Sequence, residues 1–268
     1  MQKKINVIFF FNGLRGYKIY KHIKKNKIVN RTKIFLAKKN LISKLNSLEG
    51  TKIIQTLDDP EVVNYLKKFD LAILGGFPYI FKERHLKLIK YGIINCHAGV
   101  LPKYRGGSPL NWQIINNEKY FGISTLLVNK KIDGGDIIKE KKFILKKKYK
   151  IMDLHKIVNE EFPFLVEKSI FKLINKKKLK KQKNTRSYFK QRSNEDSFLD
   201  FKNKKYIEIF NFVRALQKPY PKPYFFFQNK KVSISKIKKI QLKLTPGEIL
   251  KKNKCYLIGC KDSGIQVS

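Results

Sequence analysis

The sequence predicts an α/β fold, in which a mostly parallel sheet carries helices on both faces and a small β-rich domain follows. The first 140 residues alternate short apolar runs with segments whose apolar residues recur three or four positions apart. Strands that alternate with short helices indicate a parallel sheet with crossover helices. Beyond residue 198 the pattern changes to one helix and several short apolar runs between turn residues, which is typical of a small barrel or partial barrel.

Four apolar runs in the first part are expected to be strands: Ile5–Phe11, Lys33–Ala37, Asp70–Leu74 and Gly92–Asn95. Three periodic segments between them are expected to be helices: Gly13–Ile23, Pro60–Lys67 and Phe81–Lys90. The second helix has a clear start, because Asp58 or Asp59 can cap it and Pro60 fits its first turn. In such sheets ligands bind beyond the carboxyl ends of the strands, so a site is expected after Leu74 and at Asn95.

The second part begins with a long amphipathic segment, Asp153–Asn175, which is expected to be a helix with a kink at Pro163. The basic, aperiodic stretch 176–197 is predicted to be a linker between a large domain, 1–175, and a small one, 198–268. In the small domain Lys204–Leu216 is expected to be a helix. Its expected strands are Tyr224–Phe227, Val232–Ile237, Cys255–Gly259 and Ile265–Val267.

The net charge of +40 raises the question of a nucleic-acid partner. Only seven of the 60 basic residues are Arg, the residue that most often recognises phosphates and base edges. The excess of Lys comes together with an excess of Ile, Asn, Phe and Tyr, a joint bias that an AT-rich coding sequence produces. We therefore attribute most of the charge to composition, and a polyanionic partner or attraction of an anionic substrate stays an alternative.

Other features of the composition concern location and metal binding. No apolar run approaches the roughly 18 residues of a membrane span, so no membrane association is expected. Ile5–Phe11 is too short for a signal peptide and no small-residue cleavage site follows it. The chain has three cysteines, an odd number that cannot all pair in disulfides, and their spacing is not that of metal ligands: Cys96, Cys255 and Cys260. We expect no metal and a cytoplasmic location.

Three polar residues, Asn95, His97 and Asp133, form the candidate catalytic group. Asn95 and His97 are two positions apart at a strand end, so their side chains face the same side. Asp133 precedes two glycines that let the chain turn tightly. An Asn amide can stabilise a developing oxyanion, a His can donate to the same oxygen or move a proton, and an Asp can orient the imidazole.

This group suits acyl transfer without a covalent intermediate. No Gly-x-Ser-x-Gly motif is present, and nothing in the sequence marks Cys96 as an activated thiolate. Taken singly, each residue also has an ordinary structural explanation. His97 can cap a helix or bond within the core, and Asn95 and Asp133 can be turn residues.

The stretches NCHAGVLPKYRGGSPLNW (95–112) and GISTLLVNKKIDGGDII (122–138) resemble the signature of the folate-dependent formyltransferases. That family includes methionyl-tRNA, glycinamide ribonucleotide and sugar-nucleotide formyltransferases. Its pattern is Asn-x-His, a Leu-Pro-x-Tyr-Arg-Gly loop and an Asp in an Asp-x-Gly turn. The resemblance covers roughly 70–140 and implies a Rossmann-like catalytic domain with a partial OB-like barrel after it. It also implies Asn95, His97 and Asp133 as catalytic residues and 10-formyltetrahydrofolate as the formyl donor.

The resemblance further implies where folate binds. In the family the pterin packs against the loop after the third of these strands, here GGFPYIF (75–81), and against the backbone before the catalytic Asp. The residues expected to bind folate are therefore Gly76, Phe77, Tyr79, Ile80 and Ile132. The glycines would allow close backbone approach, and the aromatic side chains would form apolar walls. An aromatic loop that only packs on the sheet is the alternative.

Three similarities favour an amino-sugar nucleotide, dTDP- or UDP-linked, as the acceptor. RGGSPLNWQI is closer to the sugar-nucleotide branch, and the stretch 32–47 lacks the Gly/Pro-rich basic insertion of tRNA enzymes. The stretch 193–227 resembles the start of the C-terminal domain of amino-sugar enzymes, although Pro223 and Tyr224 replace a small pair and the chain ends short of a full barrel. Arg105 is the expected ligand of the diphosphate. Alternatively, Arg105 holds its loop by bonding backbone carbonyls.

Two other functions stay in competition. Methionyl-tRNA formyltransferase, with tRNA as the partner, is favoured by the charge and by the shared motif. A non-catalytic nucleic-acid-binding protein on this fold is the third hypothesis, and it predicts that the catalytic group is dispensable. The sequence names neither the sugar nor the nucleotide, and it leaves the oligomeric state open, with a homodimer as one alternative.

Overall fold

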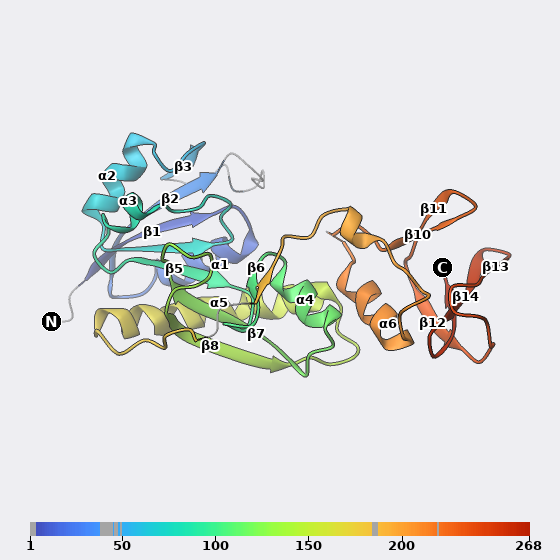
Figure 1. Ribbon diagram of the computed structural model, residues 1–268. Helices are drawn as coiled ribbons and strands as arrows, with labels where there is room; N and C mark the ends of the chain where they lie inside the picture. Colours follow the sequence, from blue (N-terminus) through green and yellow to red (C-terminus); the bar gives the residue numbers. More distant parts are fainter. Residues whose placement is uncertain (1–3, 38–44, 46–47, 49, 184–186, 219) are drawn as a thin grey trace. The chain divides into compact units, whose positions relative to one another are not determined.

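The structure is a computed structural model that describes residues 4–37, 45, 48, 50–183, 187–218 and 220–268 (Figure 1). The chain forms two compact units that are interleaved along the sequence. Unit 1 comprises Met1–Arg105, Gly122–Lys142 and Lys156–Tyr188, and unit 2 comprises Gly106–Phe121, Phe143–His155 and Phe189–Ser268. This division differs from the linear one expected from the sequence, since two segments before residue 175 join the second unit.

Unit 1 is built on a seven-stranded sheet with the strand order β3-β2-β1-β4-β5-β7-β8. The strands are β1 (Ile5–Phe11), β2 (Val29–Ala37), β3 (Thr51–Ile54), β4 (Leu71–Gly75), β5 (Ile93–His97), β7 (Tyr120–Leu127) and β8 (Ile137–Ile144). Neighbours from β3 to β5 run parallel, and β7 pairs antiparallel with β5. The prediction of a mostly parallel sheet is confirmed, and β3, β7 and β8 are strands that the sequence does not predict.

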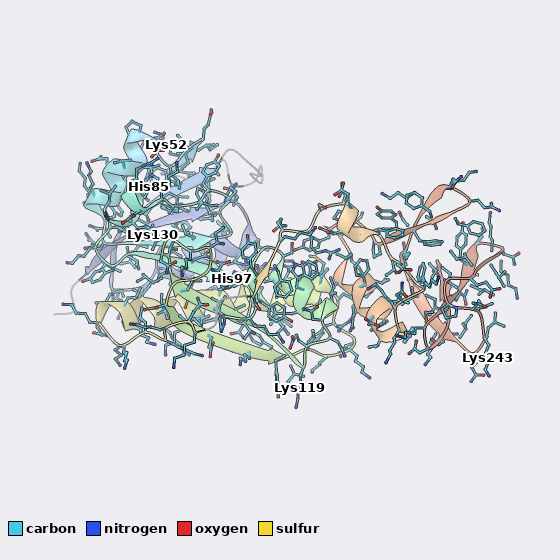
Figure 2. The ribbon with its side chains drawn as sticks, viewed as in Figure 1. Lys52, His85, His97, Lys119, Lys130 and Lys243 are labelled. Carbon is cyan, nitrogen blue, oxygen red and sulfur yellow. The ribbon has the colours of Figure 1, made fainter. Side chains whose placement is uncertain are left out.

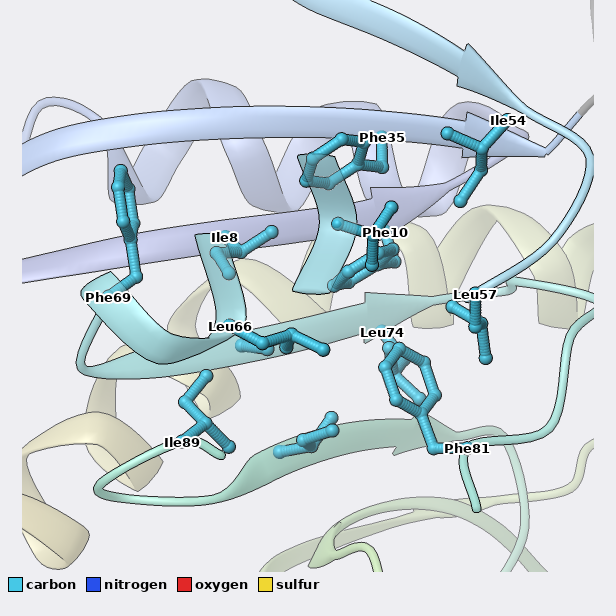
Figure 3. Packing of buried hydrophobic residues seen from close by; sticks show 13 residues of the cluster. Ile8, Phe10, Phe35, Ile54, Leu57, Leu66, Phe69, Leu74, Phe81 and Ile89 are labelled. Atoms are coloured by element: carbon cyan, nitrogen blue, oxygen red, sulfur yellow. The ribbon is translucent and has the colours of Figure 1, made fainter. Parts of the chain in front are cut away.

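Helices cover both faces of this sheet. On one face Ile8 and Phe10 of β1 pack in a buried cluster with residues of α2 (Pro60–Lys68), and Figure 3 shows this cluster. On the other face Phe9 contacts Tyr20 of α1 (Leu14–Ile23), with 5.3 Å between the ring centroids. The alternation along β1 produces this division, because successive side chains of a strand point to opposite faces.

The long helix α5 (Ile151–Ile174) continues through Pro163 and lies beside α1. His22 Nε2 of α1 lies 2.7 Å from Glu167 Oε2 of α5. The Arg15 guanidinium of α1 lies 5.0 Å from the centre of the Phe162 ring of α5. The hydroxyl groups of Thr125 in β7 and Ser169 in α5 form a buried hydrogen bond, with 2.7 Å between the two oxygen atoms. Helix α5 therefore packs against both α1 and the antiparallel edge of the sheet.

Two predicted helices of unit 1 differ in how well they match the structure. In α2 the Asp59 carboxylate accepts from the Glu61 amide at 2.9 Å and Pro60 occupies the first turn, as predicted. Helix α3 (Glu83–Leu86) is much shorter than the predicted Phe81–Lys90. The chain tightens after α3, because the Leu88 amide donates to the His85 carbonyl three residues back rather than four.

Unit 2 contains two α-helices that lie wholly within it and a set of short strands. The helices are α4 (Pro109–Ile115) and α6 (Tyr206–Ala215), and the Asn111 amide of α4 donates to the Ala215 carbonyl at 2.8 Å. The strands are β10 (Tyr224–Phe227), β11 (Lys230–Ser233), β12 (Ile237–Ile240), β13 (Ile249–Lys252), β14 (Cys255–Cys260) and β15 (Ser263–Val267). β10 and β11 form a hairpin, and the others form an antiparallel sheet in the order β12-β15-β14-β13.

The β-rich C-terminal part is thus confirmed, with two differences in its strands. The predicted strand Val232–Ile237 is divided between β11 and β12, and β13 is an additional strand. The predicted linker 176–197 contains β9 (Tyr188–Phe189) and the short 3-10 helix Glu195–Ser197. The expectation about a tRNA-type insertion concerns 32–47, and most of that stretch after residue 37 lies outside the described residues.

Candidate active site

Asn95 and His97 lie at the carboxyl end of β5, the strand where the sheet changes from parallel to antiparallel pairing. The preceding residues Ile93 and Ile94 are fully buried, which fixes this strand in the sheet. Asn95 pairs with Leu126 of β7 and His97 with Ser124. Because the two residues are two positions apart, their side chains leave the strand on the same side. Figure 2 labels His97 in this part of unit 1.

Asp133 lies in a tight turn that follows β7. Its φ of 49° is in the left-handed region, which Asp tolerates better than most residues. Asn129 closes the turn, since its side chain accepts from the Lys131 amide at 2.9 Å and donates to the Gly134 carbonyl at 3.3 Å. At Gly135 a Cβ atom would lie 1.7 Å from the Leu127 carbonyl oxygen, so only glycine fits there. The turn therefore holds the Asp133 carboxylate in one place.

The structure brings the three predicted catalytic residues into direct contact. Asn95 Nδ2 donates to Asp133 Oδ1 at 2.9 Å, and His97 Nδ1 lies 3.3 Å from Asp133 Oδ2. The side chains of His97 and Asp133 are only 6% and 9% exposed. One carboxylate thus connects the amide and the imidazole through its two oxygens. In such a poorly solvated place these contacts are stronger than they would be in water.

The second ring nitrogen of His97 has its own partner. His97 Nε2 donates to the Tyr104 carbonyl oxygen at 2.5 Å. Both ring nitrogens therefore lie beside oxygen atoms, Nε2 beside the Tyr104 carbonyl and Nδ1 beside the Asp133 carboxyl group. These two contacts fix the orientation of the ring.

Arg105 holds the loop after β5 to the Asp133 turn. Its Nε and Nη2 atoms both donate to the Ile132 carbonyl, at 3.0 Å and 2.6 Å, and the residue is 7% exposed. Of the two roles expected for Arg105, this geometry shows the one in which the guanidinium holds its loop by bonding a backbone carbonyl. Its expected contact with a substrate diphosphate stays a prediction.

A pocket of about 210 Å³ opens beside Asn95 and Asp133. Four of the residues expected to bind folate line it, Phe77, Tyr79 and Ile80 from the loop after β4, and Ile132 from the Asp133 turn. The other lining residues are Leu74, Phe81, Leu126, Val128, Asn129, Lys130 and Lys131. The structure thus places the aromatic loop and two of the three candidate catalytic residues around one pocket.

Ile80 and Ile132 are large apolar residues that stay exposed in this pocket, at 70% and 46%. Exposed apolar side chains around a concave site are available to contact a ligand ring. Phe77 and Tyr79 pack against the core cluster on one side and line the pocket on the other. The loop therefore does both things that the sequence suggested, packing on the sheet and forming a pocket wall.

The two glycines of this loop have different surroundings, and the expected close approach of folate to Gly76 stays a prediction. A Cβ at Gly75 would lie 2.4 Å from the Gly16 Cα, so Gly75 lets α1 pack closely on β4. Gly76 does not line the pocket; it has a φ of +77° and nothing within 4 Å of the Cβ position. Its positive φ is a conformation that glycine adopts at no steric cost, just before Phe77 and Tyr79.

Two contributors to the site are not apparent from the sequence. The Tyr104 carbonyl, which accepts from His97, is a backbone group and has no side-chain signature. Gln182 donates through Nε2 to the carbonyls of Asp133 and Gly135, at 2.8 Å and 2.6 Å. Gln182 belongs to the stretch predicted to be a linker, where a polar residue carries no signal of a contact. This stretch therefore holds the turn that presents the carboxylate.

Other chemistry finds no support at this site. Cys96 is buried, and burial raises the pKa of its thiol to about 12, so it is not a thiolate nucleophile. In the described part of the chain no three His, Cys, Asp or Glu side chains come together as metal ligands. No helix formed by the described residues is both long and apolar enough for a membrane span.

Asn95, His97 and Asp133 thus form a connected polar group beside an aromatic-lined pocket, at the carboxyl end of a strand in an α/β sheet. Residues 5–167 match the formyl transferase family, and residues 192–268 match the C-terminal domain of formyl transferases. The first match covers more than half of the chain. The chain therefore belongs to the formyl transferase family.

Two curated relatives illustrate the range of the family. The bifunctional polymyxin resistance protein ArnA of Wigglesworthia glossinidia brevipalpis is 35% identical over 211 residues, which are 76% of this chain and 32% of ArnA. The methionyl-tRNA formyltransferase of Caldanaerobacter subterraneus subsp. tengcongensis is 31% identical over 237 residues, which are 84% of this chain and 75% of that enzyme. The chain thus spans about a third of the first relative's length and three quarters of the second's.

Solved structures confirm the fold over nearly the whole chain. WlaRD, a sugar 3N-formyl transferase solved in the presence of dTDP and 5-N-formyl-THF, has a TM-score of 0.73 at 20% identity and covers 100% of this chain and 98% of its own. A 4-N formyltransferase from Francisella tularensis has a TM-score of 0.74 at 20% identity, covering 91% and 99%. HypX from Aquifex aeolicus in complex with tetrahydrofolic acid has a TM-score of 0.69 at 18% identity, covering 97% and 43%.

Proposed function

We propose that this protein transfers a formyl group from 10-formyltetrahydrofolate to the primary amine of an amino-sugar nucleotide, dTDP- or UDP-linked. The observation that carries the proposal is the contact of Asn95 and His97 with Asp133 beside the pocket lined by Phe77 and Tyr79. A polar catalytic group at one end of an apolar pocket suits a donor with a flat ring system and a reactive formyl group.

The pocket residues fit the pterin ring of a folate. Phe77, Ile80 and Ile132 offer apolar surface, while the Asn95 amide and Asp133 carboxylate offer a donor and an acceptor. Its volume of about 210 Å³ is below the roughly 300–1,000 Å³ usual for a site that encloses a whole drug-sized ligand. It therefore accepts one ring system, and the glutamate tail continues towards solvent, where Lys130 and Lys131 line the same pocket.

The transfer forms a bond between the acceptor nitrogen and the formyl carbon and breaks the bond from that carbon to the folate nitrogen. Asn95 Nδ2 carries two hydrogens; one bonds Asp133, and the other meets no acceptor among the described residues. That second hydrogen is available to stabilise negative charge on the formyl oxygen. Asp133 accepts the proton that the attacking amine loses, and a proton returns to the leaving nitrogen.

His97 has two candidate roles, and the geometry favours one of them. Donation from His97 to the formyl oxygen requires the ring to leave either Asp133 or the Tyr104 carbonyl. Exchange of a proton with Asp133 requires no movement of the ring. We therefore assign His97 to holding and moving the proton at Asp133, with Asn95 as the donor to the oxygen.

For the acceptor, the structural similarity to the sugar 3N-formyl transferase WlaRD and to the Helicobacter canadensis enzyme in complex with dTDP-3-aminofucose, over 98% of each chain, supports a sugar nucleotide. Sequence relatives named methionyl-tRNA formyltransferase, at 28–34% identity, favour tRNA as the second candidate. A cytoplasmic location and a homodimer stay predictions that accompany either acceptor.

The experiment is a formylation assay with the full chain, 10-formyltetrahydrofolate and a panel of dTDP-, UDP- and GDP-linked amino sugars, with methionyl-tRNA in parallel. Mass spectrometry detects the formylated product, and a thermal-shift series with a stable folate analogue reports binding. We expect formylation of an amino-sugar nucleotide without any RNA. Efficient formylation of methionyl-tRNA with no activity on any amino-sugar nucleotide would establish the second candidate instead.

A further inference from the structure

Arg214, in the last turn of α6, is a buried cation without an acidic partner among the described residues. It is 5% exposed. Its Nε donates to Asn211 Oδ1 at 2.8 Å, and its Nη1 donates to the carbonyls of Lys146 and Tyr149 at 3.3 Å and 2.7 Å. A guanidinium has five N–H groups. The two on Nη2 have no acceptor in the part of the chain that the structure describes.

Arg214 lines a pocket of about 240 Å³ that belongs entirely to unit 2. Four lysines share this lining: Lys147, Lys148, Lys150 and Lys236. The remaining lining residues are Phe210, Val213, Gln217, Ser235 and Ile237. The pocket thus combines five cationic side chains with an apolar wall, and none of the described residues that line it carries a carboxylate. We call it the basic pocket.

This concentration of charge is unfavourable while the pocket is without an anion. Burial lowers the pKa of the Arg214 guanidinium, because the charged form loses hydration. Like charges around one concavity also repel each other, and a concave wall of low polarity strengthens their field. A further cation is near, since Lys222 Nζ donates to the Ser235 hydroxyl at 2.9 Å. An anion in the basic pocket removes both the repulsion and the unmet donors.

We propose that the basic pocket binds the phosphate group of a small phosphorylated molecule. The open Nη2 side of Arg214 can donate two hydrogen bonds to phosphate oxygens, and the lysines neutralise the remaining charge. Phe210, Val213 and Ile237 offer surface to the organic part of the ligand, which favours a nucleotide over inorganic phosphate. The proposal rests on residues of unit 2 alone and does not depend on the reaction proposed for unit 1.

The first experiment locates the ligand by lysine acetylation. The full chain is acetylated at low reagent excess with and without UDP or inorganic pyrophosphate, and mass spectrometry quantifies each lysine. We expect protection of Lys147, Lys148, Lys150 and Lys236, with no change at the exposed Lys251 and Lys254 of unit 2. Uniform protection of all lysines would overturn the proposal, because it would show only diffuse attraction by the net charge.

The second experiment separates the pocket from the general charge with matched variants. The pocket variant is Lys147→Gln with Lys236→Gln, and the control is Lys251→Gln with Lys254→Gln, which changes the net charge equally. Calorimetric titration with UDP is expected to show affinity about tenfold weaker in the pocket variant, as for a lost charged hydrogen bond. The control is expected to stay within about twofold of wild type. Equal weakening in both variants would contradict the proposal.

Two further arms keep the result interpretable. Arg214→Lys keeps the charge but loses the fork, and is expected to weaken UDP binding while thermal unfolding shows whether the variant is folded. A folded Arg214→Lys chain with wild-type affinity would remove Arg214 from the proposal. A short oligoribonucleotide is the competing probe. Protection of the four lysines by RNA, with none by UDP or pyrophosphate, would make the basic pocket part of an RNA-binding surface instead.

Discussion

Asp133 connects the other two residues of the proposed catalytic group, because one of its oxygens contacts Asn95 and the other contacts His97. Asn tolerates the left-handed backbone that the turn imposes at this position, so Asp133→Asn is expected to fold normally. Loss of the proton acceptor is expected to lower kcat by about 100-fold or more. Steady-state kinetics measures this, with Asp136→Asn as the matched control, since it changes the same charge outside the pocket lining. Equal losses in the two variants would argue against the assigned role.

His97→Ala removes both ring contacts at once, to Asp133 and to the Tyr104 carbonyl. We expect turnover to fall by about 100-fold or more, and the double variant with Asp133→Asn to be little worse than either single one. Non-additivity is expected because the two side chains act as one unit. Thermal unfolding checks that each variant is folded. Wild-type turnover in His97→Ala would exclude the imidazole from the reaction.

At the scale of single residues, the sequence indicated which side chains could meet, and the resemblance to formyltransferases implied that they act together. Asn95, His97 and Asp133 stand at turn and strand-end positions that the sequence shows directly. The acceptors that hold them are backbone carbonyls, such as that of Tyr104, and any residue can supply one. Arg105 had two candidate roles, because a guanidinium can donate hydrogen bonds to a phosphate or to a backbone carbonyl, and the sequence does not distinguish the two. The structure shows one of these bonds.

The loop after β4 depends on the left-handed turn at Gly76. Gly76→Val forces a β-branched residue into this conformation, at an expected strain of about 1–2 kcal/mol. We expect weaker binding of a folate analogue and unchanged binding of a nucleotide, measured by calorimetry. Gly50→Val is the control, since Gly50 has a φ of +70° and open space but lies outside the pocket lining. Equal loss of both ligands in Gly76→Val would indicate misfolding rather than a local effect.

Helix α3, which follows this loop, contacts Asp58, a residue two positions before α2, through Arg84 and His85. The Arg84 guanidinium, and then His85, hold the pKa of Asp58 at about 2, below the usual 3.8. The folded state thus favours the carboxylate, so this contribution is complete above about pH 4 and is lost as the pH falls towards 2. Asp58→Asn is expected to reduce the drop in urea midpoint between these pH values. The reduction in this pH-dependent drop is expected to be small, because the Asp58 carboxylate is exposed to solvent. An Asp58→Asn chain whose urea midpoint falls as much as that of wild type would show that Asp58 does not contribute.

At the scale of elements, burial on two faces made the parallel strands predictable. β1 and β4 are almost continuous apolar runs, as expected for strands covered by helices on both sides. β8 reads IIKEKKFI and is largely exposed, so it lacks an apolar run. β3 has only four residues. Both strands are defined by pairing with neighbours rather than by their own composition, and pairing is not visible in local sequence.

The whole molecule carries a net charge of +40, which affects every binding measurement. For a sugar nucleotide, two or three phosphate contacts give a shallow fall of log affinity with log salt concentration. For tRNA, about eight contacts give a steep fall. We expect the shallow slope for the acceptor, measured by titration over a range of potassium chloride. A steep slope together with RNA-dependent activity would support the tRNA function.

At this scale the sequence predicted a catalytic α/β part and a β-rich part, and the two family matches follow the same order. The interleaving of the two compact units was not predictable, because it depends on where 106–121 and 143–155 pack in space. The charge was the least informative property. Lysines are spread over both units, as the labels of Lys52 and Lys130 in unit 1 and Lys119 and Lys243 in unit 2 illustrate in Figure 2.

The turn at Asp133 also bears on how the protein ages. Asp followed by Gly is a pair prone to isomerise, because the glycine amide can attack the aspartate carboxyl and form a succinimide. In the folded chain the Gly134 amide donates to the Lys131 carbonyl at 3.0 Å, and the carboxylate is held by Asn95 and His97. The attacking and attacked groups are thus both engaged elsewhere. The folded turn is therefore expected to form a succinimide at Asp133-Gly134 more slowly than the unfolded chain does.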